Sequence, residues 1–152
     1  MKLKGQWASM LIATTLLAGC GTVVRSMPFP AEAQQPDASG VKVYFGSQEH
    51  PAVKTNFGKH DVSVRVARAR DEKHDAHSDR VKDEKTTCEL ALDDALRRLR
   101  AYAKSHGANG VVNATTRFHD IRTDSTTTFT CGVSPGAGAI AVSGDVVLLD
   151  TQ

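Results

Sequence analysis

Three cysteines and six histidines are the side chains with the most distinctive chemistry in this 152-residue chain. Cys20 closes the run Leu17-Ala18-Gly19-Cys20, which follows an apolar segment and two N-terminal lysines, Lys2 and Lys4. A basic start and an apolar run are typical of an export signal, and small residues that lead into a cysteine are typical of a lipobox. We therefore expect Cys20 to carry a covalent lipid after residues 1–19, the signal peptide, are removed.

Two alternatives for this segment are a transmembrane helix and an ordinary secretory signal. A spanning helix needs about 20 apolar residues, and Thr14, Thr15 and Gly19 interrupt a shorter run. An ordinary signal would leave Cys20 as a free thiol in an oxidising compartment. Gly21 follows the cysteine at the position where aspartate is typical of inner-membrane retention. The sequence therefore predicts an anchor in the cell outer membrane with the chain facing the periplasm.

The other two cysteines, Cys88 and Cys131, form an even pair in this predicted oxidising envelope. A disulfide is the simplest use of such a pair, and on the chain-entropy estimate it would stabilise the fold by about 4 kcal/mol. A metal–thiolate pair is the alternative. However, the chain has no Cys-x-x-Cys spacing, and neither cysteine has a histidine or a second cysteine within four positions.

His74 and His77 lie three residues apart in a segment rich in carboxylates. Histidines at this spacing share one face of a helical turn, and with Asp75 and Asp79 they could ligate a divalent metal such as zinc, copper or nickel. The alternative is a solvated loop over residues 70–85, because that stretch is almost entirely charged and cannot bury an apolar face.

The motifs of other function classes are absent from the sequence. The chain contains neither Gly-x-Ser-x-Gly nor His-Glu-x-x-His, and its glycine-rich stretches lack the phosphate-binding patterns. No catalytic residue is assigned, and we expect no enzyme. Removal of the signal takes Lys2 and Lys4, so the 19 basic side chains fall to 17, equal to the 17 acidic ones. Such a neutral domain has no electrostatic footprint for nucleic acid.

The elements that must position these residues follow a proline-rich stretch. Residues 20–40 hold three prolines and are expected to form a flexible tether after the lipidated cysteine. A single globular domain is then expected over 41–152. Alternating apolar side chains predict its strands, at 41–45, 61–69, 110–118, 125–131 and 139–149. The third and fourth of these are expected to pair as a hairpin, and Gly144 predicts a bulge or bend in the last.

One amphipathic helix is predicted to begin at Thr86, with Glu89 in a capping box, and to end at Gly107. Its apolar stripe recurs at spacings of three and four, through Cys88, Ala91, Leu92, Ala95, Leu96, Leu99, Tyr102 and Ala103. The order β-β-α-β-β-β predicts an α+β domain in which this helix packs on a mostly antiparallel sheet of about five strands. A Cys88–Cys131 disulfide would join the helix to the sheet.

Several motifs of the predicted domain resemble a family of small envelope proteins that carries the automatic name excinuclease ATPase subunit. They are Val41-Lys42-Val43-Tyr44-Phe45-Gly46, Thr87-Cys88-Glu89-Leu90-Ala91-Leu92, Ser105-His106-Gly107-Ala108-Asn109-Gly110-Val111-Val112-Asn113, Phe129-Thr130-Cys131 and Gly144-Asp145-Val146. The chain has no Walker motif and no zinc-finger cysteines to match the family's name. The resemblance therefore implies an envelope protein of uncharacterised role rather than an ATPase.

More distantly, the layout is similar to that of the outer-membrane sensor lipoproteins of the Rcs stress phosphorelay. The shared parts are the lipobox, a proline-rich stretch, an opening strand, cysteines, and a helix that runs into Ala108-Asn109-Gly110-Val111-Val112. Those proteins carry two disulfides, whereas this chain has one candidate pair. The resemblance implies a non-enzymatic module that binds an envelope protein or senses envelope stress. Periplasmic binding of a divalent metal by residues 74–79 is the alternative function.

Overall fold

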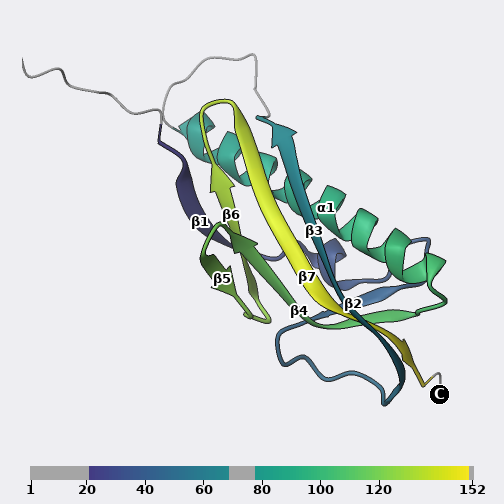
Figure 1. The fold of residues 1–152 in the computed structure, drawn as a ribbon. Helices are drawn as coiled ribbons and strands as arrows, with labels where there is room; N and C mark the ends of the chain where they lie inside the picture. Colours follow the sequence, from purple (N-terminus) through teal and green to yellow (C-terminus); the bar gives the residue numbers. More distant parts are fainter. Residues whose placement is uncertain (1–20, 69–77, 151–152) are drawn as a thin grey trace, which may run out of the picture.

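The computed structural model describes residues 21–68 and 78–150, apart from the side chains of residues 78–82. Within these residues one long α-helix packs on one face of a seven-stranded, mostly antiparallel sheet (Figure 1). The elements in chain order are β1 (Val23–Pro28), the 3₁₀-helix η1 (Ala31–Gln34), β2 (Lys42–Phe45), β3 (Val53–Ala67), α1 (Ser78–Ser105), β4 (Gly110–Phe118), β5 (Ile121–Thr123), β6 (Thr128–Val133) and β7 (Ala137–Leu149). The predicted α+β class is confirmed.

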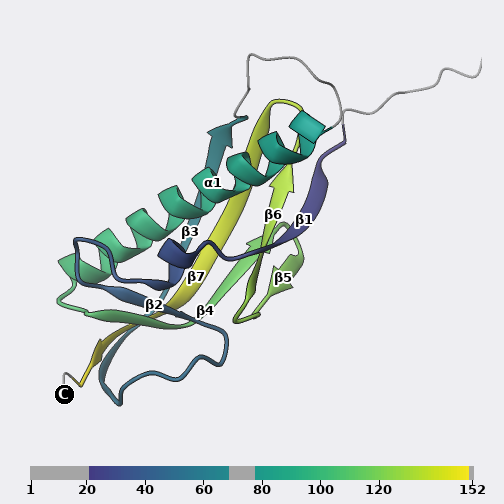
Figure 2. The same ribbon diagram turned by 180° about the vertical axis from the view of Figure 1, so that it is seen from behind.

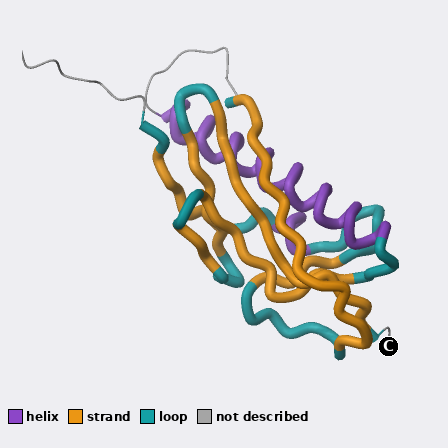
Figure 3. The backbone as a smooth tube through the Cα atoms, in the orientation of Figure 1, coloured by secondary structure: helices purple, strands orange, loops and turns teal. Residues whose placement is uncertain are grey.

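Strand β7 organises the sheet because it pairs with three other strands. One of its edges pairs with β3 along nearly its whole length, and the other pairs with β4 and, near its start, with β6. The sheet continues from β6 to β1 and from β4 to β2, which is the parallel pair. Figure 3 shows these long strands running side by side, with the helix behind them.

The apolar stripe of α1 forms the core with the facing side of the sheet. Cys88, Ala91, Leu92 and Leu99 are fully buried, and they pack with valines of β2, β4 and β7. The helix ends as predicted, since Gly107 adopts φ +75° and the amide of Ala108 donates to the carbonyl of Ala103. This pattern is a Schellman motif, in which glycine supplies the left-handed residue.

The predicted start of the helix is wrong, because α1 already begins at Ser78. Residues 78–85 are therefore helical rather than a solvated loop, and Thr86 and Cys88 lie well inside the helix. Tertiary contacts provide the reason. Glu84 is only 8% exposed and forms ion pairs with Arg25 at 2.9 Å and Arg68 at 3.8 Å. A charged residue held in this way stabilises helical turns that hydrophobic periodicity cannot reveal.

The flexible tether expected over residues 20–40 is wrong for the described part of that segment. β1 pairs with β6 through six residues, from Val23 opposite Val133 to Pro28 opposite Thr128. After it, the ring of Phe29 lies 4.1 Å from that of Phe45 and Ala33 is buried. Prolines are compatible with this arrangement because β1 lies at an edge of the sheet, where a missing amide donor is tolerated.

Three strand predictions also need correction. β3 begins at Val53, before the predicted start at residue 61, because pairing with β7 continues through two register shifts. The expected hairpin of 110–118 with 125–131 is replaced by one between β4 and the short β5. The bulge expected at Gly144 lies on the opposite strand, β4, at Asn113. A β-carbon on Gly144 would meet Val111 at 2.6 Å, so glycine admits the bulged strand.

Candidate interaction site

The predicted disulfide joins Cys88 of α1 to Cys131 of β6, with their Cα atoms 5.9 Å apart. Both cysteines are fully buried. The bridge therefore fastens the helix to the sheet inside the core, as the apolar position of Cys88 in the stripe predicts. Both thiols are used in this bond, so the metal–thiolate alternative for this pair does not apply.

Arg100 joins α1 to η1 and the residues that follow it. Its side chain crosses to the chain after β1, where the guanidinium donates to the carbonyl of Ala33 at 3.0 Å and to that of Gln35 at 2.6 Å. The carboxylate of Asp37 lies 3.9 Å away. Arg100 is only 5% exposed, and its Nε is the one buried side-chain polar atom without a hydrogen-bond partner among the described residues.

Burial and charge have opposite effects on this cluster. Desolvation lowers the pKa of Arg100, while the nearby carboxylates of Asp37 and Asp93 raise it in partial compensation. Burial alone would raise the pKa of Asp37, but hydrogen bonds from Ser39 and the charge of Arg100 hold it below its ordinary value of 3.8. Arg100 and Asp37 therefore form a charged pair that holds η1 against the helix.

η1 lies beside α1 (Figure 2), and residues of both elements line a groove between them. Its volume is about 330 Å³. The apolar part of its lining includes Ala33 and Leu92, which are buried, and Leu90, which is 51% exposed. Glu32, Glu89 and Asp93 supply carboxylates around these apolar side chains, and Arg100 also lines the groove. Glu89 lies 3.7 Å from Lys85, so part of the acidic charge is already paired.

A stack of three rings lies where β3 crosses the C-terminal part of α1. The imidazole of His60 is parallel to the Tyr102 ring at 3.5 Å, and His106 lies 4.1 Å from the same ring. Tyr102 separates the two histidines, so they are not placed to share a metal ion. Among the side chains that the structure describes, no group of three or more His, Cys, Asp and Glu residues could hold one.

The remaining sequence-predicted sites fall largely outside the described residues. These are the lipidation site Cys20 and three members of the proposed metal cluster, His74, Asp75 and His77. Asp79 lies in the first turn of α1, but its side chain is outside the description as well. Lipidation and metal binding therefore stay predictions.

Sequence reasoning missed both the Arg100 cluster and the groove. Arg100 lies four residues after Leu96 and three before Ala103, which places it at the edge of the apolar stripe, but its partners are backbone carbonyls, which leave no trace in residue types. Leu90, an apolar side chain outside the main stripe, was the other available signal.

Within the described residues, no helix is long and apolar enough to cross a membrane. Comparison with protein-family models, curated proteins and solved structures finds no match to this chain.

Proposed function

We propose that this chain is an outer-membrane lipoprotein whose periplasmic domain works by binding another envelope protein, without catalytic chemistry. The proposal combines an anchor at Cys20 with a contact surface at the groove between η1 and α1. Protein binding and envelope-stress sensing both require these two parts. The observation that carries it is the groove itself, an apolar surface surrounded by carboxylates.

The disulfide supports the proposed compartment. Disulfides form and persist in oxidising spaces such as the periplasm and are rare in the cytosol. The Cys88–Cys131 bond lies in the core and joins the helix to the sheet. A chain that carries this bond is suited to the compartment to which the lipobox would direct it.

The groove supports protein binding and indicates the chemistry of the partner. Leu90 leaves an apolar side chain half exposed beside Ala33 and Leu92, and such a surface gains stability when another apolar group covers it. Glu32, Glu89 and Asp93 favour cationic neighbours around that group. We therefore assign as the occupant a protein segment in which apolar side chains are flanked by lysine or arginine.

The anchor is tested with a Cys20→Ala variant. Wild-type protein should fractionate with the outer membrane and show the added mass of the lipid, and the variant should do neither. A variant that stays in the membrane fraction as the wild type does would overturn the anchor.

The groove is tested by photocrosslinking in intact cells, with the reactive group at position 90. The matched control places the same group at Lys54, whose side chain is 53% exposed and lies on β3, away from the groove. We expect a defined adduct from position 90 alone, and we expect the charge reversal Asp93→Lys to weaken it. The assignment fails if position 54 gives the same adduct, or if Asp93→Lys leaves its yield unchanged.

A further inference from the structure

The distance between the predicted lipid anchor and the folded domain is short. β1 begins its pairing with β6 at Val23, so only Gly21 and Thr22 separate this ladder from Cys20. A fully extended chain covers at most about 3.6 Å per residue, so the three steps from Cys20 to Val23 span at most about 11 Å. Residues 23–28, within the segment for which the sequence predicts a flexible tether, belong to the sheet.

The start of β1 lies at one end of an elongated molecule, which we call the anchor end. Val23 pairs with Val133, and the adjoining turn at residues 134–136 connects β6 to β7. The end of β3 lies there too, since the amide of Arg68 donates to the carbonyl of Gly136. In Figures 1 and 2 this turn and the start of α1 lie close to the first residues of β1.

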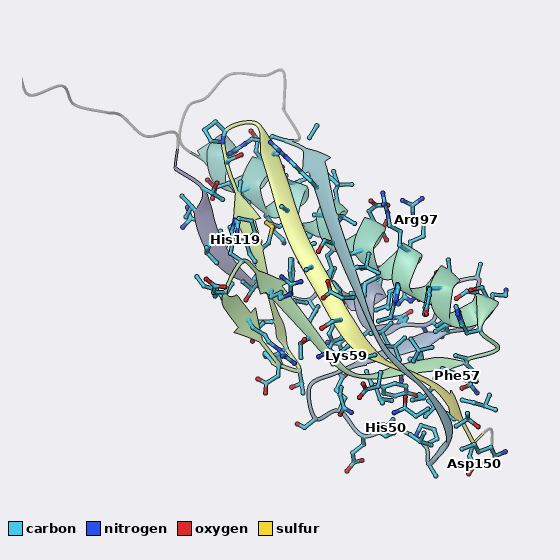
Figure 4. All side chains as sticks on the ribbon, in the orientation of Figure 1. His50, Phe57, Lys59, Arg97, His119 and Asp150 are labelled. Atoms are coloured by element: carbon cyan, nitrogen blue, oxygen red, sulfur yellow. A yellow bond between two sulfur atoms is a disulfide. The ribbon has the colours of Figure 1, made fainter. Side chains whose placement is uncertain are left out.

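The opposite end of the molecule, the distal end, carries the start of β3 and the end of β7. Figure 4 shows His50, Phe57 and Asp150 together at this end. Helix α1 runs between the two ends, and 28 residues at 1.5 Å each make it about 42 Å long. Phe57 is 43% exposed and Val53 is 40% exposed, so the distal end also presents apolar side chains.

We propose that the anchor end of the domain contacts the surface of the lipid bilayer, while the distal end is held away from it. The inference rests on the proposed lipidation of Cys20. A lipid inserted at Cys20 brings Val23 to within about 11 Å of its own attachment point. The turn at 134–136 then faces the lipid headgroups, and the strands and α1 extend away from them.

The short link between Cys20 and Val23, rather than electrostatic attraction to the lipids, holds the anchor end at the bilayer. Arg25, Arg68 and Lys85 lie at the anchor end, but Asp83 and Glu84 lie among them, and Glu84 pairs with both arginines. Only a small positive excess remains among the described side chains. Salt screens interactions between exposed charges, so an orientation set by the covalent anchor should persist when the ionic strength is raised.

The experiment measures how close each end lies to the bilayer. Purified lipidated protein is incorporated into phosphatidylethanolamine–phosphatidylglycerol vesicles that carry a nitroxide quencher on the headgroup. A fluorophore is attached through Gly136→Cys, where an added β-carbon meets no atom within 4 Å, or through Thr55→Cys at an exposed position of β3. We expect quenching at position 136, at low and high salt, and at position 55 no quenching beyond that of unlipidated protein.

A lengthened variant provides the control, with a 20-residue glycine–serine segment inserted between Thr22 and Val23. It should lose the quenching at position 136 while it keeps the lipid. Equal quenching at positions 55 and 136, or quenching at 136 that the insertion does not change, would overturn the orientation. If mass spectrometry finds no lipid on Cys20, the proposed anchor itself fails, and that result is distinct from a lipidated protein with the wrong orientation.

Discussion

At the scale of single residues, Arg100 is the side chain that most constrains the site. It is a buried cation whose partners are two backbone carbonyls and one carboxylate, all from the segment after β1. An arginine suits this position because its planar guanidinium donates in several directions at once. One helix residue thus holds η1 in place and forms part of the groove beside it.

Replacing Arg100 tests that role. Arg100→Ala should destabilise the fold by about 3 kcal/mol, because it leaves buried carbonyls unpaired and a void beside the helix. Urea unfolding measures this loss, and hydrogen exchange should show that residues 31–37 lose protection first. Arg97→Ala is the matched control, since Arg97 is exposed and pairs with Asp94 on the same helix, and it should cost at most about 0.5 kcal/mol. Similar losses in the two variants would contradict the assigned role.

Asp37 gives a pH dependence of known sign. Its pKa is lower in the folded protein than the ordinary 3.8, so the folded state favours the ionised carboxylate. The resulting stability is complete above the ordinary pKa and is lost as the pH falls through the lowered one. The side chain of Asp37 is 36% exposed, so solvent screens its charge, and Asp37→Asn should cost at most about 0.5 kcal/mol at pH 7 and nothing at the acid end. Urea unfolding across this pH range measures the difference, with Asp120→Asn, on the exposed β4–β5 turn, as the control.

At the scale of elements, β1 and η1 are parts of the fold rather than an approach to it. β1 closes the β6 edge of the sheet, and Phe29, between β1 and η1, packs on the core. The ring of Phe29 lies 4.1 Å from that of Phe45 and 5.6 Å from that of Phe129. Their position also creates the groove, because η1 forms the wall that faces α1.

Removing the Phe29 ring tests whether this segment contributes to stability. Phe29→Ala should destabilise the protein by about 2 kcal/mol, less than for a fully buried ring because Phe29 is only partly buried. Phe57→Ala is the control, since its ring is 43% exposed at the distal end, and it should cost less than about 1 kcal/mol. Thermal and urea unfolding measure both. A Phe29→Ala protein as stable as the wild type would mean that the packing of the Phe29 ring on the core adds no stability.

At the scale of the whole molecule, the disulfide connects the two layers. Cys88 and Cys131 are 43 residues apart in sequence, and their bond closes a loop that includes most of α1, β4 and β5. Without it, the helix is attached to the sheet by apolar packing and by the Arg100 and Glu84 contacts. The stability of the domain is therefore coupled to the oxidation state of its surroundings.

The double variant Cys88→Ala/Cys131→Ala should lose about 4 kcal/mol of stability, because the unfolded chain regains the freedom of the open loop. Urea unfolding of the variant, and of wild-type protein reduced under denaturing conditions, should give the same lowered midpoint. The folded wild type should resist reductant, since both sulfurs are buried. A variant with an unchanged midpoint would show that the bond adds no stability.

The features that local patterning determines were predicted from the sequence by itself. The spacing of apolar residues gave the stripe of α1, Gly107 gave its end, and alternation gave β2, β4 and most of β7. The even pair of cysteines gave the disulfide, because its two members fall on a buried helix face and a strand. Apart from the cysteine pair, whose members lie 43 residues apart, each of these signals depends on residues that lie close together in the chain.

Only the tertiary structure decided the features that depend on distant partners. Residues 23–28 lack a strand pattern and become β1 because β6 offers an edge, and the charged start of α1 is stabilised by arginines of β1 and the end of β3. The groove needs Arg100 to bind carbonyls 65 and 67 positions away. Backbone hydrogen bonds and buried ion pairs carry little trace in residue types. The sequence therefore determined the helix, most of the strands and the disulfide, and the tertiary structure decided where the domain begins and where its groove lies.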